Sequence, residues 1–195
     1  MVQEKTAVQA DERAAANVFR LSVDDAMIKL VRGDILKAKA DALVNTVNTA
    51  GVMGRGIALQ FAKAFPDVLK AYEAACKRGD VRIGEVTSYD LNRYEQPHFV
   101  INFPTKQHWR GKSRMEFVEA GLTALVAEVR RLGVKSVAIP PLGCGLGGLD
   151  WREVLPRIER ALQNLADVDV LIFEPAGTVG LRVLDQEVRF YFDRG

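Results

Sequence analysis

Residues that bind metals or form disulfides are scarce in this sequence. Among its 195 residues it has two cysteines, Cys76 and Cys144, and two histidines, His98 and His108. No spacing typical of a metal site connects these four residues, and so few cysteines are typical of a protein from a reducing compartment. We therefore predict two free thiols, no metal site and no cofactor.

Long apolar stretches are missing too. The chain contains no uninterrupted run of about 18 apolar residues, close to the length that a helix needs to cross a bilayer. Residues 1–25 are polar, with charges of both signs, and have no apolar core of a secretion signal. The sequence therefore predicts no membrane contact and a cytoplasmic location.

The chain also lacks an excess of one charge. Its 27 basic and 25 acidic residues give a formal net charge of +2. A protein that binds polyanions over its whole surface is more basic than this. Any contact with nucleic acid therefore has to come from a local patch.

What the chain does contain is enough apolar sequence for a core. Hydrophobic residues make up 48% of it and charged residues 27%, a composition that excludes disorder of the whole chain. Its length suits a single domain. We predict this domain at residues 26–175, between a flexible N-terminal extension at residues 1–25 and a C-terminal extension at residues 176–195.

One helix pattern stands out within the domain. In residues 113–132, apolar residues recur three and four positions apart, as they do on one face of a helix. Ser113 and Glu116 have the spacing of a capping box, and Gly133 supplies a stop. We predict a helix from Ser113 to Leu132.

Other helices and strands alternate around it. Pro66 and Gly79 mark the start and the end of a second helix, and Asp150 caps a third. The expected strands are residues 27–35, 41–48, 86–90, 98–103, 135–140 and 169–175, with weaker candidates at 18–23 and 188–192. This alternation predicts an α/β sandwich with helices on both faces of the sheet.

Glycines are concentrated in two loops, each between a strand and a helix. Gly51, Gly54 and Gly56 belong to the first loop, and residues 141–149 form the second. Glycine lets the backbone approach a ligand closely, and a helix N-terminus presents unpaired N–H groups to an anion. One such loop alone is most simply a tight turn, but two in one small domain favour a diphosphate held from two sides.

The second loop also matches the fingerprint of a dinucleotide-binding fold. Gly143, Gly145 and Gly148 have the required spacing, and Glu174 ends the next strand. However, the fingerprint normally opens its fold, and here only the last quarter of the chain follows it. The dinucleotide alternative is therefore the weaker one.

Five motifs together resemble the macro domain family. They are GDI, DALVNTVN, GVMGRGIALQF, INFPTK and PLGCGLGGLDW, which begin at Gly33, Asp41, Gly51, Ile101 and Pro141. More narrowly, they are similar to the macro domains of DarG-type antitoxins, the counterparts of DarT-type toxins. The resemblance implies a three-layer α/β/α sandwich with a mixed, mainly parallel six-stranded sheet, and ADP-ribose in a cleft at the strand ends.

The resemblance also implies which residues bind ADP-ribose. Asp34 is expected to accept a hydrogen bond from the adenine amino group, Ile35 to donate its backbone N–H nearby, and Phe173 to stack on adenine. Asn48 is expected to face the distal ribose. The loop residues expected to enclose the diphosphate and this ribose are Gly54, Arg55, Gly56, Ile57, Leu142, Gly143, Cys144, Gly145, Leu146 and Gly147.

Several of these residues also have simpler roles. An aspartate after a glycine is commonly a turn former, and Phe173 by its type belongs in a core. Asn45 and Asn48 both interrupt an apolar strand, where burial is costly unless the amide is hydrogen-bonded. We predict Asn48 as the ligand contact and Asn45 as a residue behind it.

Residues 105–114, TKQHWRGKSR, contain four basic residues, one tryptophan and no acid. Cations with an interleaved aromatic suit a single nucleic-acid strand, since phosphates meet the cations and a base stacks on the indole. The simpler alternative is a solvated loop with Trp109 as a lid on the core. The DNA contacts that we predict are Trp109, Arg110, Lys112 and Arg114.

Lys106 is the predicted catalytic residue, because the matching lysine is catalytic in DarG-type macro domains and in a related eukaryotic hydrolase of glutamate-linked ADP-ribose. A neutral amine, which needs a lowered pKa, can attack the anomeric carbon of the distal ribose; a charged amine can stabilise the transition state. The sequence leaves both open. The eukaryotic relative has an aspartate where this chain has Gly147, so its two-residue mechanism does not transfer.

The resemblance predicts an ADP-ribosyl hydrolase that removes ADP-ribose from thymidine in single-stranded DNA and so antagonises a DarT-type toxin. A non-catalytic ADP-ribose reader and an O-acetyl-ADP-ribose deacetylase are the alternatives. A DarT-type toxin is a candidate partner, although we expect the second, toxin-sequestering domain of DarG-type proteins to be absent from this chain.

Overall fold

The computed structural model describes residues 28–165 and 167–176. The predicted N-terminal extension, nearly all of the C-terminal one and the weaker strand candidates lie outside the described residues. The elements are β1 (Ile28–Val31), the 3-10 helix η1 (Ile35–Lys37), β2 (Ala42–Asn48), α1 (Gly56–Ala64), α2 (Pro66–Arg78), β3 (Thr87–Asp90), β4 (Phe99–Lys106), α3 (Met115–Leu132), β5 (Ser136–Ile139), α4 (Trp151–Leu162) and β6 (Asp169–Phe173).

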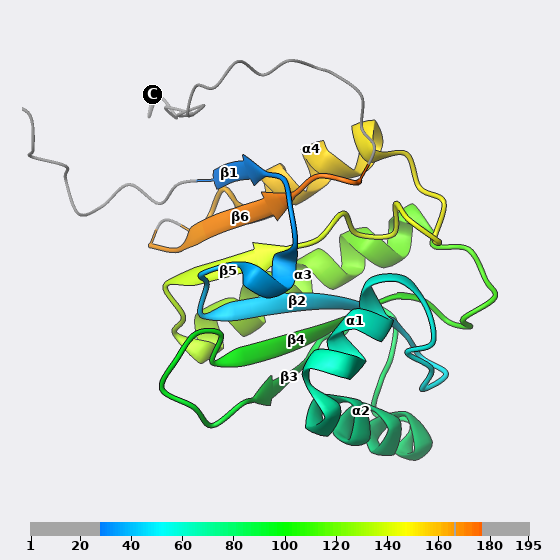
Figure 1. The fold of residues 1–195 in the computed structure, drawn as a ribbon. Helices are drawn as coiled ribbons and strands as arrows, with labels where there is room; N and C mark the ends of the chain where they lie inside the picture. The colour runs from blue at the N-terminus through cyan, green and yellow to red at the C-terminus, as the bar shows by residue number, and fades with distance from the viewer. Residues whose placement is uncertain (1–27, 166, 177–195) are drawn as a thin grey trace, which may run out of the picture.

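The strands form one six-stranded sheet in the order β1-β6-β5-β2-β4-β3 (Figure 1). Every neighbouring pair is parallel except β3 with β4. The predicted mixed, mainly parallel sheet is thus confirmed. β1 is shorter than predicted, because Gly33, with a φ of 127°, turns the chain and Ile35 enters η1.

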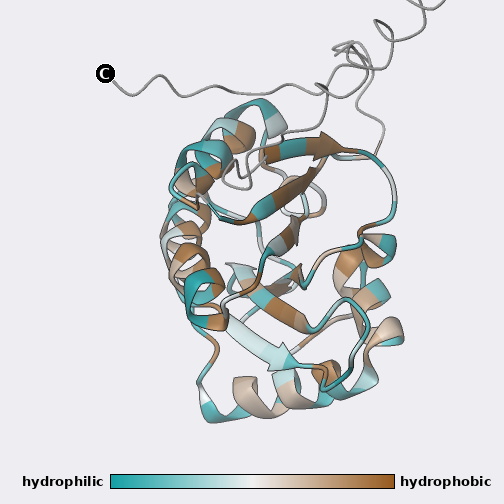
Figure 2. Cartoon of the chain, turned by 90° about the vertical axis from the view of Figure 1, so that its left-hand side faces the viewer, coloured by the Kyte–Doolittle hydropathy of each residue, from teal (hydrophilic) through white to brown (hydrophobic). Residues whose placement is uncertain are grey.

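Helices cover both faces of the sheet, as predicted (Figures 1 and 2). Successive residues of a strand point to opposite faces. In β2, Val44 packs in the core cluster that α3 and α4 cover, and Leu43 packs in the cluster on the α1 side, which includes Phe61. These two clusters, one on each face of the sheet, give the predicted three-layer α/β/α architecture.

The predicted helix signals mostly hold. α2 begins at Pro66, and Gly79 ends it in the left-handed conformation. The Asp150 side chain accepts a hydrogen bond from the backbone N–H of Arg152 at 2.9 Å and so caps α4. None of the helices in the described ranges is long and apolar enough to cross a membrane.

The predicted capping box at Ser113 is wrong. α3 begins at Met115, its N-cap is Arg114, and no side chain caps it. The reason is a tertiary contact: the backbone N–H of Ser113 donates to the carbonyl of Gly147 at 3.0 Å, which ties Ser113 to the second glycine loop. At this position a long-range hydrogen bond replaces the cap that the local sequence predicts.

Candidate functional site

A cavity of about 540 Å³ opens at the carboxyl ends of β2, β4 and β5. In sheets of this kind ligands bind outside the carboxyl ends of the parallel strands, and small-molecule sites typically have about 300–1,000 Å³. The cavity is lined by Thr46, Val47, Asn48, Val52, Gly54, Arg55, Gly56, Ile57, Ala58, Thr105, Lys106, Trp109, Pro140, Pro141, Gly143, Gly145, Leu146 and Gly147.

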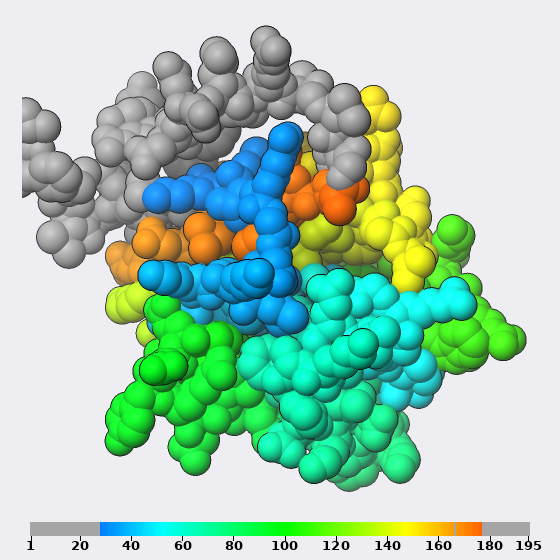
Figure 3. Space-filling view, viewed as in Figure 1, coloured from blue at the N-terminus to red at the C-terminus, as the bar shows by residue number. Residues whose placement is uncertain are grey.

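The two glycine loops enclose this one cavity from opposite sides. The first connects β2 to α1 and the second connects β5 to α4. They approach each other closely: a Cβ added to Gly56 would lie 3.5 Å from Cδ1 of Leu146. Figure 3 shows the cyan first loop beside the yellow second loop on one face of the molecule. The arrangement is the one that a ligand held from two sides requires.

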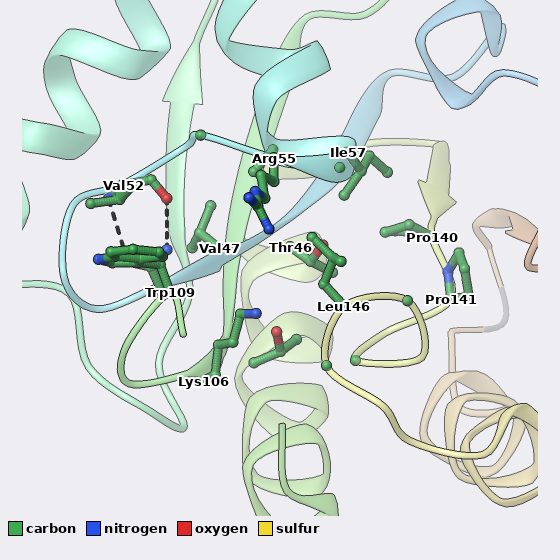
Figure 4. Close-up of a pocket in the computed structure, with 18 residues that line it drawn as sticks. Thr46, Val47, Val52, Arg55, Ile57, Lys106, Trp109, Pro140, Pro141 and Leu146 are labelled. Carbon is green, nitrogen blue, oxygen red and sulfur yellow. Dashed lines mark hydrogen bonds between the residues drawn. The ribbon is translucent and has the colours of Figure 1, made fainter. Parts of the chain in front are cut away.

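Lys106 ends β4, and its side chain points into the cavity (Figure 4). A bulge sets this direction. Pro104 has no N–H to give to the sheet, and directly after it the register with β2 shifts, so that Asn48 lies opposite Lys106. Burial, together with the nearby ammonium group of Lys112, lowers the pKa of the Lys106 amine.

The charges around the cavity are of one sign. Arg55 and Lys106 line it, and none of the lining residues of the described chain is acidic. Arg55 is also the N-cap of α1, where the helix dipole is positive. The cavity therefore suits an anionic ligand and offers no carboxylate as a general base.

Asn48 lines the cavity and also shapes the first loop. Its Nδ2 donates to the carbonyl oxygen of Val52 at 2.7 Å, and its Oδ1 accepts from the backbone N–H of Ala50 at 2.9 Å. Asn45 lies behind it, fully buried, and donates to Oδ1 of Asn102 at 3.1 Å. Of the two asparagines, Asn48 is the one that can reach a ligand.

Asp34, Ile35 and Phe173 lie beside the cavity rather than in its wall. Because Val31 pairs with Phe173, the turn after β1 lies at the end of β6. Ile35 and Phe173 are buried in one cluster, and Ile57, which lines the cavity, packs against that cluster. The exposed Asp34 side chain accepts a hydrogen bond from the backbone of η1 at 3.0 Å. Ile57 thus connects the cavity to the cluster that contains Ile35 and Phe173.

The second loop divides into residues that face the cavity and residues that face the core. Leu142 is fully buried, and Cys144 packs against the same core cluster. Burial raises the pKa of the Cys144 thiol to about 12, so it is no nucleophile at neutral pH. The loop residues that line the cavity are Gly143, Gly145, Leu146 and Gly147.

Gly147 has no room for a side chain. A Cβ at this position would overlap with Oγ of Ser113 and with the carbonyl oxygen of Gly143, and would lie 2.8 Å from Cβ of Ser113. A carboxylate cannot occupy position 147 unless the loop moves.

The basic segment at residues 105–114 borders the cavity. Trp109 lines the cavity and is 40% exposed, so it is not a lid on the core. The guanidinium carbon of Arg110 lies 4.3 Å from the centroid of its ring. Lys112 lies against the second loop, 3.1 Å from the position of a Cβ on Gly148, and Arg114 is exposed at the start of α3.

Seven lining residues were not singled out from the sequence. Five of them are the last residues of β2 and β4 or directly follow β5, so the rule that ligands bind at the carboxyl ends of parallel strands gives a signal for them. The other two belong to the first loop and α1. The seven are Thr46, Val47, Val52, Ala58, Thr105, Pro140 and Pro141.

Comparison with known proteins agrees with this geometry. Residues 44–158 match the macro domain family. This chain belongs to the macro domain family. The matched region contains both glycine loops, Lys106 and the basic segment.

Two similar proteins indicate which members of the macro domain family this chain resembles. The DNA ADP-ribosyl glycohydrolase of Thermus aquaticus is 55% identical over 149 residues, which are 76% of this chain and 41% of that protein. The macrodomain of Mycobacterium tuberculosis DarG is 50% identical, with a TM-score of 0.77 over 77% of this chain and 99% of that one.

A second similar structure is Thermosipho africanus DarTG in complex with ADP-ribose. It is 35% identical, with a TM-score of 0.70 over 78% of this chain and 44% of that one. This chain spans less than half of the length of these curated glycohydrolase relatives. The predicted resemblance to DarG-type macro domains is confirmed.

Proposed function

We propose that this macro domain binds ADP-ribose and hydrolyses it from thymidine in single-stranded DNA, thereby opposing a DarT-type toxin. The observation that carries the proposal is Lys106, a lysine whose amine pKa is lowered, in a cavity between two glycine loops. A protein that only reads ADP-ribose needs the cavity but not this amine. The glycohydrolase names of similar proteins support the same choice.

The charge of the cavity supports the placement of ADP-ribose. Its diphosphate meets the backbone of both loops and the Arg55 side chain at the N-terminus of α1. The distal ribose lies toward Asn48 and Lys106, which are opposite each other in the sheet. The adenine lies toward Ile57, which packs against the cluster of Ile35 and Phe173.

Lys106 then acts as a nucleophile. The neutral amine attacks the anomeric carbon of the distal ribose, and the bond from this carbon to the base breaks, with its electron pair leaving on the base. The ammonium formed on Lys106 gives up one proton, and the base gains one. Water adds at the anomeric carbon of the resulting adduct and expels the amine, which releases ADP-ribose. This route needs no carboxylate, which agrees with a cavity in which none of the described lining residues is acidic.

Variants at Lys106 test the proposal. We expect Lys106→Ala to bind ADP-ribose in calorimetry nearly as the wild type does, yet to lose most release of ADP-ribose from a modified oligonucleotide, because the amine acts in the transition state. Lys106→Arg should be equally inactive, since a guanidinium stays protonated. Lys70→Ala, an exposed lysine on α2, is the control.

Each other outcome identifies a different function. Substantial activity of Lys106→Arg would show that the lysine acts as a cation. Full activity of Lys106→Ala would remove it from catalysis. A wild type that binds ADP-ribose but releases none would be a reader, and one that cleaves only O-acetyl-ADP-ribose would be a deacetylase.

A further inference from the structure

Exposed large apolar side chains gather at the mouth of the cavity. In the described residues there are five of them, and three line the cavity, namely Val52, Trp109 and Leu146. Scattered exposed apolar residues need no explanation, but a cluster at one cavity marks a contact surface. In Figure 4, Val52 and Trp109 lie on one side of the Lys106 amine and Leu146 lies on the other. We call these three residues the apolar rim.

Trp109 is the part of the rim that is held in place. The guanidinium carbon of Arg110 lies 4.3 Å from its ring centroid, a cation–π distance. The ring of His108 lies 5.3 Å away at an interplanar angle of 30°. A flat aromatic side chain that is held by neighbours yet 40% exposed is suited to stack on another flat ring.

The rim also indicates which kind of group it does not bind. A carboxyl side chain esterified to ribose has no flat ring that could stack on Trp109 and no phosphates beside it. The rim offers an exposed indole ring, and the basic segment that carries Trp109 also contains Arg110, Lys112 and Arg114, whose charges suit the phosphates that flank a base. A nucleobase satisfies both conditions, because it is planar and neutral and is attached to charged phosphates.

On this basis we propose that the apolar rim is the subsite for the base that carries ADP-ribose, and that this base stacks on Trp109. The proposal rests on the proposed function for the position of ADP-ribose. It makes Trp109 a specificity-determining residue that favours base-linked over protein-linked ADP-ribose. It gives Arg110 the role of holding the indole.

A binding experiment tests the rim without catalysis. The chain has two tryptophans, Trp109 and Trp151, so in Trp151→Phe all tryptophan emission comes from Trp109. We expect an unmodified single-stranded oligothymidylate to quench this emission, because stacking brings a base onto the indole. The reverse variant, Trp109→Phe, should show no quenching. Equal quenching in both variants, or none in Trp151→Phe, would overturn the proposal.

A kinetic experiment separates the rim from the ADP-ribose site. For release from a modified oligonucleotide, Trp109→Ala should raise KM about 5- to 150-fold, the loss of one stacked base. Its affinity for free ADP-ribose should stay within about twofold of the wild type, because a rim contact made only by the base is absent from that ligand. Tyr94→Ala removes an aromatic side chain that is fully exposed and does not line the cavity, and should change neither value.

The outcomes distinguish the two proposals. A wild type that does not cleave the modified oligonucleotide contradicts the proposed function, and the quenching experiment still decides whether the rim binds a base. A Trp109→Ala variant that loses ADP-ribose affinity as much as oligonucleotide affinity would place Trp109 in the ADP-ribose site and overturn the inference.

Discussion

Gly147 is the position at which the smallest change should have the largest effect on the second loop. In Gly147→Ala, the added methyl group would overlap with Oγ of Ser113 and the carbonyl oxygen of Gly143. Neither atom is the end of a long flexible side chain, and one belongs to the backbone. The loop must therefore move. Overpacking of this kind typically costs about 1–3 kcal/mol.

That cost has two measurable consequences. In a domain of this size, about 1–3 kcal/mol lowers Tm by roughly 2–12 °C. Because Gly147 lines the cavity, the displaced loop should also weaken ADP-ribose in calorimetry. Gly145→Ala is the matched control for Tm, since nothing lies within 4 Å of a Cβ there. Ser113→Ala combined with Gly147→Ala should recover only part of the loss, because the Gly143 carbonyl remains.

If Gly147→Ala melts and binds ADP-ribose as the wild type does, the packing of this loop against Ser113 is not what keeps position 147 a glycine. A fall of Tm by the same amount in Gly145→Ala would equally contradict the reasoning, since it would show that any alanine in the loop is costly. Differential scanning calorimetry of the four proteins decides between these results.

The remaining predictions concern a titration, a ligand contact and a structural carboxylate. Lys112→Met removes a positive charge near Lys106, so the pKa of the Lys106 amine should rise. Because the neutral amine reacts, the rising limb of kcat against pH should then move to higher pH. An unmoved limb would refute the role of Lys106 as a nucleophile. Asp34→Ala should weaken ADP-ribose by about 1–3 kcal/mol in calorimetry, while Asp34→Asn, which can still cap η1, separates adenine recognition from loss of the cap. Burial raises the pKa of Asp41, but hydrogen bonds from Gln96 and from the start of β5 outweigh it and lower the pKa, so the stability that Asp41 supplies is present at neutral pH and is lost as pH falls through its folded pKa. Asp41→Ala should therefore lower the urea midpoint at pH 7, and lower it less at pH 3.

Much of the fold could be predicted because its signals are local. Pro66 and Gly79 delimit α2 through their own backbone preferences, and the three- and four-residue spacing of α3 identifies its buried face. The order of the strands in the sheet has no such local signal. It depends on which elements pack against each other, and it came from the structure.

The candidate site also has features that the sequence predicts and features that it does not. The two glycine loops could be recognised one at a time, but their meeting at Gly56 and Leu146 could not. The failure at Ser113 has the same cause, since its N–H is used by a residue that is distant in sequence. Asp34 and Phe173 are a turn former and a core residue in the structure, as their types alone suggest; an adenine contact is a property of the complex.

The direction of Lys106 shows how the geometry of a proposed catalytic side chain depends on two strands at once. Pro104 has no N–H to donate to the sheet, the register with β2 shifts directly after it, and Lys106 comes to lie opposite Asn48. Burial and the nearby Lys112 lower the pKa of this lysine, while a bound diphosphate would bring negative charge that raises it. The two effects oppose each other only in the complex. Lys112 therefore contributes most to keeping the Lys106 amine neutral when substrate is bound. The pH dependence of kcat reports this contribution, because it reflects pKa values in the enzyme–substrate complex.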